Sequence, residues 1–186
     1  MRRLLPVLLL LLAACGGSSG THDAPPAAAP GGCPTSVRLT GVPASTVDTG
    51  GRLVPQEPPT SAVVCRYAPA AGGARSDLAV ERPLTGGLDR LAADLQLAPA
   101  GPGAAVCADA GSAPVTPYLL RLTYPDGVVV VRADDDPAGC PGTRTDTVTS
   151  AQGRGDVLAA SASAGTWTVP PLPDADQRCV PDRTGR

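Results

Sequence analysis

The sequence contains no lysine, asparagine, phenylalanine or isoleucine, and it has one histidine and one tryptophan. The absence of asparagine excludes N-linked glycosylation, because the acceptor motif begins with that residue. The absence of lysine excludes Schiff-base and serine–lysine catalysis. All fifteen basic residues are therefore arginines, and the chain has 22 glycines and 22 prolines. We attribute this composition to a GC-rich genome, since the codons of the missing residues are rich in A and T.

The chain also lacks the common patterns of catalytic and metal sites. Its only histidine, His22, lies in a stretch of Gly, Ser, Pro and Ala, where nothing holds it beside a serine as a hydrolase triad requires. S-x-x-K does not occur, because the chain has no lysine, and there is no C-x-x-C pair for zinc or redox chemistry. No concentrated basic stripe is present, so a nucleic-acid partner is not expected. We assign no catalytic residue, metal or cofactor.

The N-terminal stretch MRRLLPVLLLLLAACG has the features of an export signal. Arg2 and Arg3 give it a positive start, and the apolar residues 4–12 are well short of the roughly 20 that span a bilayer. The motif LAAC (residues 12–15), followed by glycine, resembles the lipobox of bacterial lipoproteins. This resemblance implies a mature chain that begins at a lipid-modified Cys15. The alternative is an ordinary secretory signal, with Cys15 lost or left as a plain thiol.

These features divide the chain into four parts. We expect a signal peptide (1–14), a lipid anchor with its tether (15–32), one globular domain (33–168) and a proline-rich tail (169–186). A flexible tether of this length reaches roughly 20 to 25 Å. The expected location is the extracytoplasmic face of the cell membrane, because two or more acyl chains on one residue hold a protein there stably.

If the first cysteine carries lipid, five cysteines remain in an oxidising compartment, where thiols pair. Sequence alone does not determine their pairing. We favour Cys33 with Cys65 and Cys107 with Cys140, because the two intervals are nearly equal, at 32 and 33 residues. Cys179 is then left over: it stays free, exchanges into one of the pairs or bridges to another chain.

The first half of the domain predicts short strands and one helix. Strands are expected at residues 36–40, 62–67 and 77–82, and the Pro- and Gly-rich residues 41–60 are expected to form a surface loop. Residues 88–98 place leucine and alanine at i, i+3, i+4 and i+7, which is the one-face spacing of an amphipathic helix. Two acidic residues on its polar face disfavour a membrane surface, so we expect it to pack on a sheet.

The second half contains a hairpin signal. Residues 118–124 alternate between two faces, and Pro-Asp-Gly (125–127) has turn chemistry. The four valines at 128–131 cannot alternate in polarity, so this strand is expected to be buried on both faces and central. A polar edge strand (143–149) and a short helix (155–162) should follow.

This order of elements predicts an α+β fold. We expect a mainly antiparallel sheet with one or two helices on one face, stapled by disulfides. The arrangement of cysteines, helix and Tyr-Pro-Asp-Gly hairpin between Cys33 and Ala162 is similar to small uncharacterised actinobacterial lipoproteins. That resemblance brings no known activity with it.

Two groups of residues are candidates for a binding site. The aspartates at 134–136 offer oxygen ligands for calcium, although they lack EF-hand spacing and a polar strand end explains them more simply. Tyr118, Tyr124 and Trp167 are candidates for lining a ligand groove, but large aromatic residues are more often core. Glu81 is expected to be solvated or paired with the adjacent Arg82.

The expected function is therefore a non-enzymatic envelope lipoprotein that binds a protein partner or envelope component. The alternative is a small envelope hydrolase that uses aspartates. Only two of the 17 acidic residues are glutamates, so the catalytic acids of such an enzyme would be aspartates. That alternative requires two close carboxylates in a cleft, one of them with a raised pKa. A solute receptor of a transporter is less favoured, because such proteins usually need two lobes.

Overall fold

The computed structural model describes residues 32–71, 75–98, 114–135, 142–150 and 152–170. Three strands and a helix are followed by four strands and a second helix, which is an α+β order. They are β1 (Ser36–Arg38), β2 (Ser61–Tyr67), β3 (Arg75–Leu84), α1 (Leu88–Gln96), β4 (Thr116–Tyr124), β5 (Gly127–Asp135), β6 (Thr143–Arg144), β7 (Thr149–Ser150) and α2 (Gly155–Ala164).

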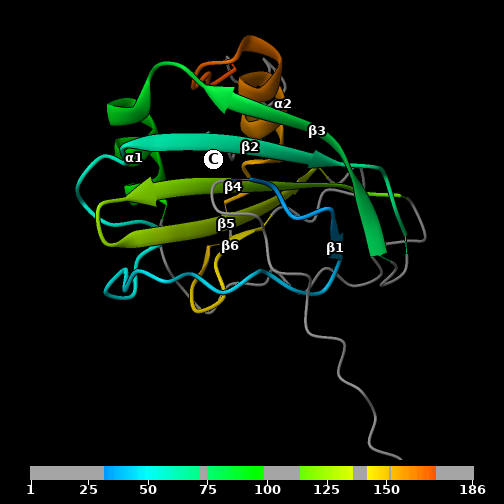
Figure 1. Cartoon of the computed structure of the whole chain (residues 1–186), viewed down its shortest axis with the longest axis horizontal. Helices are drawn as coiled ribbons and strands as arrows, with labels where there is room; N and C mark the ends of the chain where they lie inside the picture. Colours follow the sequence, from blue (N-terminus) through cyan, green and yellow to red (C-terminus); the bar gives the residue numbers. More distant parts are fainter. Residues whose placement is uncertain (1–31, 72–74, 99–113, 136–141, 151, 171–186) are drawn as a thin grey trace, which may run out of the picture.

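The strands form one sheet in the order β1-β3-β2-β4-β5-β6-β7 (Figure 1). All neighbouring strands pair antiparallel, and the sheet curves into a half-barrel. The predicted α+β class with a mainly antiparallel sheet is confirmed. The expectation that the valine strand is central is wrong. The central position belongs to β4, while the valine strand, β5, has only the two-residue β6 on its other side.

The predicted hairpin is formed by β4 and β5. Alternate residues of β4 face opposite clusters: Leu120 lies in the larger core and Leu119 in the smaller one. The valines of β5 also divide, since Val129 contributes to the larger core and Val130 to the smaller, so this strand is buried on both faces as predicted. Gly127 has φ 151° in the tight turn, and a side chain there would collide with Thr46.

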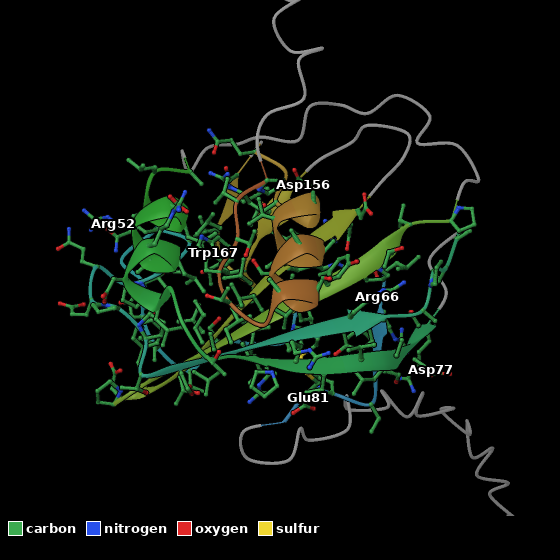
Figure 2. The ribbon with its side chains drawn as sticks, turned by 90° about the horizontal axis from the view of Figure 1, so that it is seen from above. Arg52, Arg66, Asp77, Glu81, Asp156 and Trp167 are labelled. Carbon is green, nitrogen blue, oxygen red and sulfur yellow. A yellow bond between two sulfur atoms is a disulfide. The ribbon has the colours of Figure 1, made fainter. Side chains whose placement is uncertain are left out.

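The larger core contains apolar residues of the sheet and of both helices. Leu91 and Leu95 of α1 and Val157 and Leu158 of α2 are buried in it together with β2, β4 and β5. The predicted packing of the first helix in the core is confirmed, although the helix ends at Gln96. In Figure 2, α2 stands over the sheet. Within the described residues, no helix is both long and apolar enough to cross a membrane.

Two expectations about local structure are wrong. Residues 41–60 contain no strand or helix, but they are not simply a surface loop, because Leu53 and Val54 are fully buried in the larger core. Residues 143–149 do not form one edge strand. They form the small hairpin of β6 and β7, whose turn is closed when the Thr145 hydroxyl accepts the backbone N–H of Val148 at 2.9 Å.

A mostly irregular stretch of chain packs over the smaller core of the sheet. Residues 33–47, called the N-terminal segment below, cross this core and then follow the edge of β5. The Thr46 N–H donates to the Val128 carbonyl at 2.8 Å, and the Val130 N–H donates to the Ser45 hydroxyl at 3.2 Å. Beneath the segment lies the smaller core, which consists of Cys33, Val37, Cys65, Tyr67, Leu119 and Val130.

Candidate functional site

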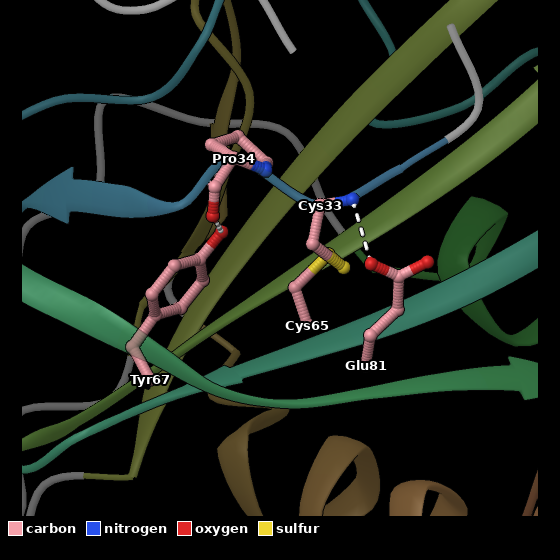
Figure 3. The surroundings of a disulfide bond; sticks show 5 residues. All are labelled: Cys33, Pro34, Cys65, Tyr67 and Glu81. Carbon is pink, nitrogen blue, oxygen red and sulfur yellow. Dashed lines mark hydrogen bonds between the residues drawn. A yellow bond between two sulfur atoms is a disulfide. The ribbon is translucent and has the colours of Figure 1, made fainter. Parts of the chain in front are cut away.

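A disulfide joins Cys33 to Cys65 at the start of the N-terminal segment (Figure 3). The sulfurs are 2.04 Å apart and the Cα atoms 5.7 Å apart, within the usual range for a disulfide. Cys65 is fully buried in β2, and Cys33 is 8% exposed. This is the first of the two pairs expected from the sequence.

The other cysteines lie outside the described residues. These are Cys15, Cys107, Cys140 and Cys179. Their proposed lipid, pairing and thiol states therefore stay predictions.

Two hydrogen bonds hold the same point of the chain. The Cys33 N–H donates to the Glu81 carboxylate of β3 at 3.1 Å, and the Tyr67 hydroxyl of β2 donates to the Pro34 carbonyl at 3.1 Å (Figure 3). Burial raises the pKa of Tyr67 well above its ordinary value, so this hydroxyl stays a donor at neutral pH. Glu81 is exposed as expected, but its hydrogen bond to the Cys33 backbone was not foreseen, and none of the described ion pairs includes it.

The beginning of the domain is therefore fixed by one covalent bond and two hydrogen bonds to adjacent strands. Any load carried by the chain before Cys33 passes directly into β2, which pairs with β3 on one side and β4 on the other.

A buried arginine forms the second polar centre under the N-terminal segment. Arg132 of β5 is fully buried, and its guanidinium binds Asp134 with two hydrogen bonds, at 2.8 and 3.1 Å. The same guanidinium donates to the Gly41 carbonyl at 2.9 Å and to the carbonyl of Arg38. It therefore attaches the turn after β1 to the sheet. The only sequence signal for this centre is an arginine that directly follows a run of four valines, three of which are buried.

Arg144 of β6 extends this centre. Its guanidinium donates to the Leu39 carbonyl at 3.1 Å and lies 3.7 Å from the Asp134 carboxylate. Burial is the main cause that lowers the pKa of Arg144, and the nearby Arg132 adds to it. Asp134, a candidate calcium ligand by sequence, is thus engaged by two arginines. Asp135 is exposed, and Asp136 lies outside the described residues.

A shallow hollow of about 280 Å³ lies between the N-terminal segment and the turn of the β6–β7 hairpin. It brings together Asp48 and Asp146, which the sequence does not single out as a pair. The Asp48 carboxylate already accepts the Gly50 N–H at 2.9 Å. No three potential metal ligands cluster among the residues the structure describes. The remaining lining residues are Ser45, Thr46, Val47, Thr49 and Thr147.

The three aromatic candidates are core residues rather than the lining of a groove. Tyr118, Tyr124 and Trp167 are 4%, 5% and 5% exposed, and all belong to the larger core. The Tyr124 hydroxyl has no hydrogen-bond partner among the described atoms, and burial raises its pKa to about 12. The Trp167 indole N–H donates to the Asp94 carboxylate at 2.7 Å, which joins the chain after α2 to α1.

No protein-family model matches the chain, and no curated protein or solved structure gives a significant match to it.

Proposed function

We propose that this chain is a lipid-anchored protein of the extracytoplasmic membrane face, whose domain binds a protein or another component of the cell envelope without catalysing a reaction. The observation that carries the proposal is the order of features at the N-terminus. Two arginines, a short apolar core, the LAAC motif at residues 12–15 and a tether follow one another without interruption. A secretory signal alone does not require the cysteine at that position.

The described domain supports an exported location. The Cys33–Cys65 disulfide is compatible with an oxidising compartment and is rare in the cytosol. It also lies where the proposed tether joins the domain, and it is buried against reductants. The fold thus offers a mechanical reason for a cysteine at position 33: it transfers the attachment from a flexible chain to the sheet.

The arrangement of the helices is part of this proposal. We infer that α1 and α2 cover the same face of the sheet, because both contribute leucines to one core cluster. The N-terminal segment then covers the other face, close to the tether. We therefore expect the binding surface to consist of exposed strand and loop residues.

One observation favours the alternative of an aspartate hydrolase. Asp48 and Asp146 line the same hollow although they are far apart in sequence. Under this alternative, envelope preparations from cells that carry Asp48→Asn/Asp146→Asn should lose a hydrolytic activity. Cells that carry Asp89→Asn/Asp156→Asn are the control and should keep that activity, because these two aspartates are exposed on the helices. The binding proposal expects both double variants to behave like the parent in that assay.

Fractionation of cells that express the full chain tests the anchor. The parent protein should remain with the membrane after a high-salt wash, whereas Cys15→Ser should lose the acyl chains and leave the membrane fraction after export. Cys179→Ser is the matched control and should remain membrane-bound. Equal release of the parent and Cys15→Ser by salt would contradict the proposed anchor. Cross-linking in intact cells, with the parent chain as bait, then identifies the partner.

A further inference from the structure

Four exposed arginines lie on β1, β3 and β2, the three strands at one edge of the sheet. They form what we call the arginine patch, which consists of Arg38, Arg66, Arg75 and Arg82. None of the ion pairs among the described residues includes any of these four. The patch thus concentrates positive charge in a chain that has more acidic than basic residues.

The strand register places Arg66 and Arg82 on the helix-bearing side of the sheet. Arg66 is two residues after Val64, which is buried in the larger core, and Arg82 pairs directly with Val64. Side chains two apart in a strand, or opposite each other in a ladder, share a face. Figure 2 shows Arg66 on the side that carries α2, whereas Glu81 lies on the other side.

The other two arginines face the same way. Val37 of β1 points into the smaller core, so its neighbour Arg38 points to the opposite, helix-bearing side. Arg38 pairs directly with Arg75. On β3, the register shift lies between Arg75 and Arg82. Because of this shift, the two side chains lie on the same face of the sheet although they are an odd number of residues apart.

Two arginines directly opposite each other in adjacent strands are unfavourable for the fold. Asp77 lies beside them on β3 but forms no ion pair with either. Asp135 and Asp156, at the end of β5 and the start of α2, are also exposed, and neither belongs to a described ion pair. An arrangement that costs stability and leaves its charges open to solvent points to an external anionic partner.

We propose that the arginine patch docks the domain on the anionic headgroups of the membrane to which the chain is anchored. The inference rests on the proposed lipid anchor. A tether with a reach of roughly 20 to 25 Å keeps the domain within contact distance of the headgroups, so even a weak surface interaction is populated. Arginine also forms bidentate hydrogen bonds with phosphate oxygens. Docking would hold the domain in one orientation, with the opposite face and the hollow away from the patch.

The single tryptophan makes the docking measurable. The lipidated chain is reconstituted in vesicles of neutral phosphatidylcholine, with or without anionic phosphatidylglycerol, and a trace of dansyl-labelled lipid accepts energy from Trp167. Transfer should be higher in the anionic vesicles and should fall to the neutral value in high salt, because surface charge interactions are screened. Each arginine near such a surface contributes about a factor of five.

The matched variants are Arg38→Ala/Arg75→Ala and Arg52→Ala/Arg90→Ala. Both remove two exposed positive charges, but only the first removes them from the patch. The first pair should lower the ratio of docked to undocked protein about 25-fold, while the second should leave the ratio near the parent value. Equal transfer in neutral and anionic vesicles, or an equal effect of both pairs, would overturn the proposal.

Two further outcomes separate this inference from the anchor. Intact-mass analysis of the same preparation reports the lipid independently of transfer. If the chain is unlipidated, the proposed anchor is wrong, and the docking proposal is then tested by sedimentation of that chain with the same vesicles. Selective binding to anionic vesicles supports docking by the arginine patch. The absence of selective binding overturns it. Binding to inorganic polyphosphate without binding to anionic vesicles also overturns it, in favour of a soluble polyanion.

Discussion

Arg132 and Asp134 lie two residues apart on one face of β5, and the fully buried guanidinium binds the carboxylate through two hydrogen bonds at 2.8 and 3.1 Å. The remaining nitrogen of Arg132 holds backbone carbonyls of the N-terminal segment. One ion pair therefore connects the central sheet to the segment that follows the proposed tether. The Asp134 carboxylate compensates the charge of this buried guanidinium.

Replacement of Asp134 by alanine should strongly destabilise the domain. The variant leaves a buried guanidinium without its carboxylate, and breaking one half of a buried pair typically costs about 3 to 5 kcal/mol. Urea unfolding followed by Trp167 fluorescence measures the loss. Asp135→Ala is the control, because Asp135 is exposed, and it should stay within about 0.5 kcal/mol of the parent. A similar loss in both variants would contradict the assigned role of Asp134.

Removal of the described disulfide should also lower stability. Cys33→Ala/Cys65→Ala frees a loop of 32 residues, which costs about 3 to 4 kcal/mol in the chain-entropy account. Proteolysis should then cut first within the N-terminal segment, since that segment loses its covalent attachment. The order of cleavage sites decides the matter. Initial cutting elsewhere, with residues 33–47 still protected, would show that the hydrogen bonds to the sheet, including those of Arg132, hold the segment without the disulfide.

The second disulfide can be tested by peptide mapping without reduction. Thr116 at the start of β4 pairs with Asp135 at the end of β5, so the segments that contain Cys107 and Cys140 attach to neighbouring strand ends. We therefore expect a cross-linked peptide that contains these two residues, and a peptide that contains Cys179 as a free thiol. A cross-link between Cys179 and either of them would replace this pairing.

Tyr124 should make stability fall at high pH. Burial raises its pKa to about 12, whereas a tyrosine in the unfolded chain ionises near 10, so the unfolded state loses the proton first. The contribution is fully present below about pH 10 and is lost as the pH rises through about 12. Tyr124→Phe should flatten this decline in urea unfolding between about pH 10 and 12.

The same substitution distinguishes two buried hydroxyls at neutral pH. Tyr124→Phe removes a hydroxyl that has no described partner, so it should be neutral or stabilising. Tyr67→Phe removes the donor to the Pro34 carbonyl and should cost about 1 kcal/mol. If the two variants lose equal stability, the described difference in their hydrogen bonding is wrong.

The parts of the fold that follow from sequence are those with strong local patterns. Alternation in residues 118–124 and the run of valines after it predict the hairpin, because each strand must present apolar side chains to both clusters. The spacing of Leu88, Leu91 and Leu95 predicts the helix for the same reason. These signals depend only on neighbours in the chain.

Long-range contacts explain what the sequence does not reveal. Leu53 and Val54 lie in a Pro- and Gly-rich stretch with no periodicity, and their burial depends on how the loop returns over the larger core. Arg132 looks like an ordinary surface charge until the carbonyls of the turn after β1 are placed above it. The hollow between Asp48 and Asp146 likewise needs both loops in position.

Intact-mass spectrometry of the chain extracted from cell membranes tests the central claim most directly. The account predicts a polypeptide that starts at Cys15 and carries the added mass of a diacylglycerol group and, where the amino group is also acylated, of a further fatty acid. A chain of unmodified mass that starts at another residue, recovered from the medium rather than the membrane, would contradict it.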